Sequence, residues 1–327
     1  MHGRQIDAAL ARPYKENWID EEIVSIGRVL GVTSARIGLN VQKSGRSTGL
    51  TRGQIRVIKA VVRIGFSGGR TALFTNQIVT TKMGTAGDSG SLLLNQDNHA
   101  VGLLFAGGNS ATIYHPIAEV LNIMQVRFTA KKRDFPSFSD EDDNDRQLRI
   151  YQSDLPRLLA FSNVIGVGIG HKEQQGIDLG EPCITFFVRK KLPRSLLRAE
   201  DLIPPKIEGI ITDVVETGDL VADIENETFS VDKMRYKRNA KKRPAQPGLS
   251  IGHYQVTAGT FGAVVYDEQT NEPLILSNNH VLANATNGKD GLSKIGDPIL
   301  QPGRADGGRL NRDVIGSLLR FHPLQFL

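Results

Sequence analysis

Cysteine is almost absent from this sequence, which holds only Cys183 in 327 residues. One cysteine cannot form an internal disulfide, and no CxxC or Cys/His spacing indicates a structural zinc site. We therefore expect the apolar core alone to hold the fold together, with no metal and no cofactor.

Long apolar runs are also missing. The first residues, MHGRQIDAALARPYKENW, contain no stretch of roughly 7 to 15 apolar residues behind a basic start, as an export signal has. Nor does any window of about 18 apolar residues suggest a membrane span. The sequence predicts a soluble, cytoplasmic protein that does not act in membranes.

No strong excess of one charge is present, because 40 Lys and Arg face 35 Asp and Glu, for a net charge of +5. Such a small excess argues for nucleic-acid binding only where the charge is clustered. One cluster exists, with six basic residues between Arg235 and Arg243 and only Tyr236 as an interleaved aromatic. We interpret it as a solvated linker, so nucleic acid is an unlikely partner, and phosphate binding there is the alternative.

Short β-branched runs, by contrast, are abundant. Residues 6–128, and again those from 248 onward, show runs of four to eight such residues separated by Gly, Asn and Asp. This pattern is typical of an all-β barrel or sandwich. SLLLNQDNHAVGLLF predicts a hairpin around the turn Asn95 to Asn98, and HPIAEVLNIMQV predicts a short closing helix after Pro116.

The middle of the chain differs in composition. Residues 129–158 include KKR and SDEDDND and predict a charged linker, since the acidic run lacks the Gly and terminal Glu of a calcium loop. Residues 159–217 predict a small α+β domain with three strands and a short helix near SLLRAEDL. Residues 218–247 predict a basic linker. The glycines at 166, 168 and 170 are too closely spaced for a dinucleotide loop and favour β-turns.

The strongest chemical signal is GDSGS at 87–91. A serine nucleophile in acyl transfer needs an exposed Oγ on a tight turn beside backbone N–H groups that can bind an oxyanion. Gly87 and Gly90 permit that turn, and Asp88 can anchor the loop. We interpret Ser89 as a nucleophile and the stretch Phe105, Ala106, Gly107 as a pocket wall, although GDSGS also fits an ordinary β-turn.

A serine nucleophile needs a base, and the sequence has seven histidines. His280 follows the strand LIL through SNN, which places it at the rim of a rigid β-element. His2, His99, His115 and His322 have settings that do not fix an imidazole well. We therefore select His280, with a structural histidine as the alternative.

The acid that would orient this imidazole is harder to find. Asp7 in QIDAALA is flanked by small and apolar residues, and a buried Asp requires a partner. An Asp near a chain end is more often exposed, so the residue alone is a weak candidate.

Together the segments GTAGDSGSLLL, LILSNNHVLANA and IDAALARP resemble the trypsin-like serine peptidases, specifically their narrow-leaf-type subgroup. The resemblance implies a chymotrypsin-like double β-barrel with the triad Ser89, His280 and Asp7. It implies an oxyanion hole formed by the N–H groups of Gly87 and Ser89. It also places Met83 at the base of the primary substrate pocket, which would then be apolar.

The order of these segments departs from the family, where His precedes Asp and Ser, whereas here Asp7 and Ser89 precede His280. The sequence looks circularly permuted, cut between the His strand and the Asp strand. The two β parts, 1–128 and 248–327, comprise 208 residues, about the size of one double-barrel domain. Both parts could fold within one chain, or they could be exchanged between chains in a homo-oligomer.

We expect a serine endopeptidase that hydrolyses peptide bonds of protein or peptide substrates through an acyl-enzyme. The alternative is a catalytically inactive, protease-like interaction or assembly module.

Overall fold

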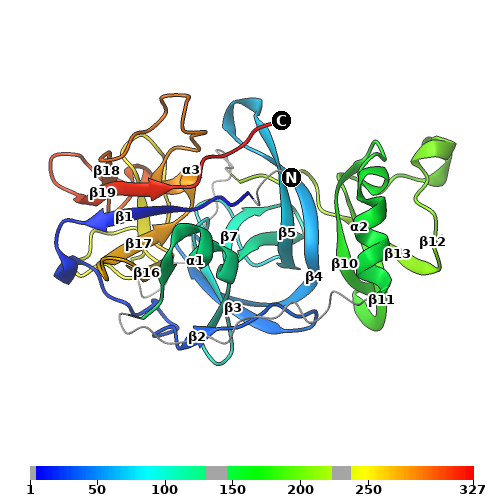
Figure 1. Ribbon diagram of the computed structural model, residues 1–327, viewed down its shortest axis with the longest axis horizontal. Coiled ribbons are helices and arrows are strands. Elements are labelled where there is room, and N and C mark those ends of the chain that lie inside the picture. The colour runs from blue at the N-terminus through cyan, green and yellow to red at the C-terminus, as the bar shows by residue number, and fades with distance from the viewer. Residues whose placement is uncertain (1–4, 130–145, 223–236) are drawn as a thin grey trace.

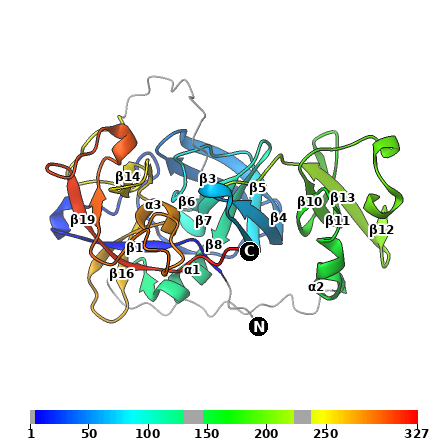
Figure 2. The same ribbon diagram turned by 90° about the horizontal axis from the view of Figure 1, so that it is seen from above.

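The computed structural model describes residues 5–129, 146–222 and 237–327. It is mainly β, with two neighbouring β bodies and a smaller α+β unit at one side (Figure 1). Seen from above, the same three parts lie in a row (Figure 2). The prediction of a mainly β fold, assembled from the N-terminal and C-terminal parts with a small α+β domain, is confirmed.

The first β body is one sheet with the strand order β15-β14-β18-β19-β1-β17-β16-β9. The N–H of Gly262, just after β15, donates to Leu276 O of β17 at 2.9 Å, so this sheet curls back on itself. β1 comes from the start of the described chain and lies between β17 and β19, antiparallel to both. The bounds are β1 Ala9–Pro13, β9 Val126–Arg127, β14 Ser250–His253, β15 Gly259–Thr260, β16 Ala263–Asp267, β17 Pro273–Ser277, β18 Pro298–Leu300 and β19 Val314–Phe321.

The second β body is a closed barrel. Its strands follow the order β4-β3-β6-β7-β8-β5, and β4 pairs with β5 to close the ring. β6 and β7 form the predicted hairpin. Phe74 and Phe105 are fully buried in its apolar core. The bounds are β2 Gly31–Val32, which pairs with β7, β3 Asn40–Gly45, β4 Gly49–Gly65, β5 Thr71–Thr81, β6 Leu92–Asn95, β7 His99–Gly107 and β8 Ala111–Pro116.

The α+β unit extends the sheet of the second barrel, because its strand β10 pairs with β4. Gly166, Gly168 and Gly170 all lie inside β10, so the expectation of a β-turn cluster was wrong. A Cβ atom on Gly168 would lie 2.4 Å from Val57 Cγ1 of β4. These glycines therefore permit close packing of two strands. The unit's strands are β10 Val164–Gln174, β11 Ile177–Val188, β12 Lys206–Ile207 and β13 Ile210–Glu216.

The helices match the sequence only in part. α1, Ile117–Met124, is the predicted closing helix, and its buried side chains recur at helical spacing. α2, Arg146–Leu158, occupies the end of the predicted linker 129–158 and packs on the α+β unit, where the Tyr151 hydroxyl donates to Lys59 O and Val167 O. The linker prediction was therefore wrong for 146–158, and the acidic run before it lies outside the described residues. The remaining helices are α3 Asn279–Leu282, η1 Glu16–Trp18, η2 Ser67–Gly69, η3 Arg194–Leu196, η4 Ala199–Asp201 and η5 Arg304–Asp306; η3 and η4 replace the short helix expected near 195–202.

The described part of the basic run is bound to the barrels. Arg238 Nη1 donates to Ser44 Oγ at 2.7 Å, Lys241 pairs with Asp313 at 3.2 Å, and the Arg243 guanidinium lies over the Trp18 ring. The expectation of a solvated linker was wrong for 237–243, because these cations have acceptors and an aromatic partner on the β bodies. Arg235 and Tyr236 lie outside the described residues.

No helix among the described residues is long and apolar enough to cross a membrane.

Candidate active site

Asp7 and His280 form a buried pair inside the first β body. Asp7 lies two residues before β1 begins, and His280 lies in α3, three residues after β17 ends. Because β1 pairs with β17, residues 273 positions apart meet: His280 Nδ1 is 2.5 Å from Asp7 Oδ2, and the His280 backbone N–H donates to Asp7 Oδ1 at 3.1 Å. Both side chains are at least 96% buried. The carboxylate therefore fixes both the position and the tautomer of the imidazole.

A second histidine supports the same acid. The Asp7 backbone N–H donates to His115 Nε2 at 2.9 Å, and the His115 ring stacks on Phe105 with 3.7 Å between centroids. Burial lowers the pKa of His115 to about 3, so this ring is neutral at pH 7 and accepts from the backbone. The expectation that the setting of His115 does not fix its imidazole well was therefore wrong. β8, where it sits, is wholly buried from 111 to 115.

Ser89 lies in the loop between β5 and β6, and this loop is anchored by the fully buried Asp88. Asp88 Oδ1 accepts from the backbone N–H groups of Ser47 and Thr48, and Oδ2 accepts from the Thr48 hydroxyl and the Thr85 N–H. Lys43, also fully buried, is 3.2 Å from the carboxylate. Burial lowers the pKa of Lys43, and Asp88 opposes that shift. Such a network holds the turn at Ser89 rigid.

Two backbone N–H groups of the loop around Ser89 have no acceptor among the described residues. Neither the Gly87 nor the Ser89 N–H has a hydrogen-bond partner among the described residues. Gly87 has a φ of +87°, and a Cβ there would lie 2.3 Å from Arg46 Nη1. Only glycine suits this position, and the resulting turn leaves both N–H groups available to an oxyanion.

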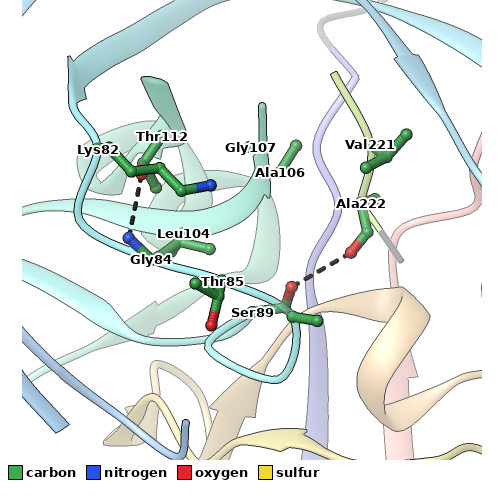
Figure 3. Close-up of a pocket in the computed structure, with 11 residues that line it drawn as sticks. Lys82, Gly84, Thr85, Ser89, Leu104, Ala106, Gly107, Thr112, Val221 and Ala222 are labelled. Atoms are coloured by element: carbon green, nitrogen blue, oxygen red, sulfur yellow. Dashed lines mark hydrogen bonds between the residues drawn. The ribbon is translucent and has the colours of Figure 1, made fainter. Parts of the chain in front are cut away.

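The Ser89 loop meets the body that carries His280. Thr260 N–H donates to Ser89 O at 2.8 Å, and a Cβ on Gly90 would lie 2.2 Å from Ser277 Oγ. Ser277 ends β17, three residues before His280. The loop therefore abuts the strand end that positions the histidine, although no hydrogen bond joins the Ser89 hydroxyl to the imidazole in this structure. The hydroxyl instead donates to Ala222 O at 3.3 Å (Figure 3).

A small cavity opens beside Ser89 (Figure 3). Ala106 and Gly107, two of the expected wall residues, line it. Met83 does not. It is buried in the core of the second barrel, where the Tyr114 hydroxyl donates to its Sδ. Phe105 points to His115 and likewise lines no part of the cavity. The lining that sequence reasoning missed comprises Lys82, Gly84, Thr85, Ala86, Leu104, Thr112, Val221 and Ala222.

These missed residues carried little local signal. Lys82 and Gly84 flank Met83 in the sequence. Because side chains alternate along an extended chain, a Met83 side chain in the barrel core would have implied that its two neighbours face the cavity. Val221 and Ala222 come from the chain after the α+β unit, and nothing in their composition indicates a site. Within the described ranges, no group of three or more His, Cys, Asp or Glu side chains is placed to hold a metal ion.

No family model matches the chain, and no curated protein matches it. Among solved structures, it is similar to a glutamic-acid-specific serine protease at 21% identity, over 38% of this chain and 60% of that one, with a TM-score of 0.25. It is similar to Thermobifida fusca protease A at 25% identity, over 32% and 55%, with a TM-score of 0.27. Cellulomonas bogoriensis chymotrypsin shows 26% identity, over 38% and 62%, with a TM-score of 0.26. The chain spans about three fifths of the length of these structures.

Proposed function

We propose that this protein is a serine endopeptidase. The observation that carries the proposal is the buried Asp7–His280 pair beside a rigid GDSG loop whose Gly87 and Ser89 N–H groups have no acceptor among the described residues. A buried acid, an oriented imidazole, an adjacent serine and an oxyanion site are the parts that acyl transfer needs.

In the proposed reaction, Ser89 Oγ attacks the substrate carbonyl carbon while His280 Nε2 accepts the hydroxyl proton. The oxyanion receives hydrogen bonds from the Gly87 and Ser89 N–H groups. The imidazolium, stabilised by Asp7, then donates its proton to the leaving amine as the C–N bond breaks. Water hydrolyses the resulting ester by the same steps in reverse roles.

The cavity beside Ser89 is the proposed site for the substrate side chain next to the scissile bond. Ala106 and Gly107 would form its wall. Met83, by its position in the core, would influence the pocket only through its neighbours Lys82 and Gly84.

We further propose that the site assembles within one chain, in a circularly permuted order. β1, which begins two residues after Asp7, pairs with β17 and β19, and His322 N–H donates to Ala8 O at 3.0 Å. These contacts support an intrachain site without any exchange of halves.

The direct test is labelling of the purified protein by a fluorophosphonate probe. Wild type should be labelled, and Ser89→Ala should abolish labelling because the nucleophile is gone. His280→Ala should lower the labelling rate by about 10³-fold or more. Ser162→Ala, on the exposed surface of the α+β unit, should label like wild type.

Absence of labelling in wild type, with the fold intact by circular dichroism, would contradict the proposal and favour an inactive interaction module. Labelling that persists in Ser89→Ala would contradict the assignment of the nucleophile.

A further inference from the structure

A short extended segment of the chain, Leu220–Ala222, lies between the ends of two barrel strands. On one side, Gly107 of β7 and Val221 exchange two backbone hydrogen bonds, both of 3.0 Å. On the other side, Gly65 N–H of β4 donates to Leu220 O at 2.9 Å, and Ala222 N–H donates to Gly65 O at 3.0 Å. The segment is thus a strand added to the barrel edge.

This added strand runs directly to the proposed nucleophile. The Ser89 hydroxyl donates to Ala222 O at 3.3 Å, and Val221 and Ala222 line the cavity beside Ser89 (Figure 3). Leu220 and Ala222 are buried, with 2% and 6% exposure. Anything that binds along the Gly107 edge must therefore displace these residues.

Extended peptides commonly bind proteins by adding a strand to an exposed sheet edge, which gives affinity through main-chain hydrogen bonds. Gly107 offers such an edge, one N–H and one C=O, at the wall of the cavity. We propose that this edge binds the substrate backbone and that Leu220–Ala222 occupies it as an internal competitor. This inference rests on the proposed peptidase function.

The geometry favours a competitor over a substrate. A carbonyl in position for attack directs its oxygen at the oxyanion donors. Ala222 O instead accepts from the Ser89 hydroxyl, and the Gly87 and Ser89 N–H groups have no acceptor in the described chain. The segment therefore blocks the cleft without presenting its carbonyl for cleavage.

The competitor is tied to the α+β unit. Thr217 follows β13 directly, and its N–H donates to Val188 O of β11 at 3.0 Å. Its carbonyl accepts from the N–H of Asn109, which lies in the barrel between β7 and β8, at 2.6 Å. Arg189, next to β11, pairs with Asp219 at 2.6 Å. The segment is therefore joined both to the α+β unit and to the barrel.

The first experiment compares hydrolysis of fluorescently labelled casein by wild type and Val221→Pro. Proline has no N–H to donate to Gly107 O, so it weakens the internal strand. We expect casein hydrolysis about three- to tenfold faster than wild type, as loss of one backbone hydrogen bond implies.

Ala199→Pro is the matched control. Ala199 begins η4 on the exposed surface of the α+β unit, and Arg198 before it already has the extended backbone that proline favours. This variant should hydrolyse casein like wild type. Fluorophosphonate labelling and melting temperature, measured on all three proteins, establish that Ser89 is reactive and the fold intact.

A second measurement needs no variant. Hydrogen exchange of wild type is followed with and without the peptide boronic acid acetyl-Leu-Val-boroAla, which forms an adduct with a reactive serine. We expect the Val221 and Ala222 amides to lose protection when the boronate binds, because its backbone replaces theirs on Gly107 and leaves Gly65 without its partner.

The outcomes separate the two proposals. If fluorophosphonate labels wild type in a Ser89-dependent manner but folded Val221→Pro hydrolyses casein no faster, the internal competitor is overturned and the peptidase stands. Unchanged protection of Val221, in a sample where the boronate blocks labelling, overturns it as well. A chain fragment ending at Ala222 in wild type but not in Ser89→Ala would also overturn it, since the segment would then be a substrate. If wild type is not labelled at all, the peptidase proposal itself fails.

Discussion

At the scale of single residues, the site is defined by groups that share Asp7. The carboxylate binds His280, while the backbone N–H of the same residue binds His115. His115 cannot take a proton without losing that acceptor and without charging a fully buried ring beside His280 and His322. Asp7 is thus held in this position only while His115 is neutral.

This arrangement predicts a specific dependence of stability on pH. The pKa of His115 is about 3 in the folded protein, below its ordinary value of 6.5, so the unfolded chain binds more protons between these pH values. The stability contributed by this residue is therefore present above pH 6.5 and is lost as pH falls toward 3, by about 1.4 kcal/mol per pH unit.

His115→Gln keeps an acceptor near Asp7 N–H but cannot take up the proton. Urea unfolding at pH 7, 6, 5 and 4 should show a smaller loss of stability in the variant than in wild type. Parallel curves for the two proteins would contradict a buried neutral His115.

Site residues that lie within a local motif could be predicted from the sequence. Site residues whose role depends only on packing could not. GDSG and SNNH are local patterns, so Ser89 and His280 could be selected as candidates from the chain. His115 follows Tyr114 in an ordinary strand, and only its stacking on Phe105 and its bond from Asp7 mark it. The bond from Asp7 spans 108 residues, so it leaves no local pattern in the sequence.

At the scale of elements, β10 attaches the α+β unit to the barrel through close backbone packing. Gly168 is the tightest point, since its absent Cβ would lie 2.4 Å from Val57 Cγ1 and 3.1 Å from Ala60 Cβ. Both neighbours belong to β4, the longest strand of the barrel, with 17 residues. The attachment of the α+β unit to the barrel therefore depends on the absence of a side chain at Gly168.

Gly168→Ala should destabilise the protein by about 1–3 kcal/mol, because overpacking forces the two strands apart. Gly252→Ala is the control. Gly252 also lies in a strand with ordinary φ, but its Cβ would meet nothing closer than 3.5 Å, so that variant should be neutral or slightly stabilised. Urea unfolding measures both, and equal stability of the two variants would refute the packing argument.

The elements were predictable where periodicity and turn residues agreed. The hairpin 92–107 and α1 follow this rule, because a short apolar run or helical spacing coincides with Asn or Pro at the boundary. α2 was missed because an acidic run precedes it and its mean composition is polar, so only a narrow face, with Tyr151 and Leu158, is buried. The three glycines of β10 were misread because close strand packing and turns both require glycine.

At the scale of the whole molecule, the two β bodies meet along the site and both chain ends contribute to one of them. β1 is an inner strand of its sheet, and Gln325 N–H donates to Gln5 Oε1 at 3.0 Å. The strand partners of β1 are β17 and β19, which follow it by more than 250 residues. In our proposal, the whole site therefore forms within one monomer.

The proposal predicts that activity per molecule is independent of concentration. Fluorophosphonate labelling, measured as fraction labelled per unit time over a dilution series from about 10 μM to 10 nM, should stay constant. A halved rate at low concentration, recovered by concentrating the sample, would instead indicate that protease halves are exchanged between chains.

The central place of β1 in its sheet also determines when the site can form during synthesis of the chain. His280 is synthesised 273 residues after Asp7. At a synthesis rate of roughly 5 to 20 residues per second, the ribosome needs about 14 to 55 seconds to cover that distance. For nearly all of this interval β1 lacks both of its strand neighbours, whereas all the strands of the Ser89 barrel are synthesised within its first half. A nascent chain therefore contains Ser89 long before it contains His280, so under the proposed function it could not act as a peptidase until its synthesis is nearly complete.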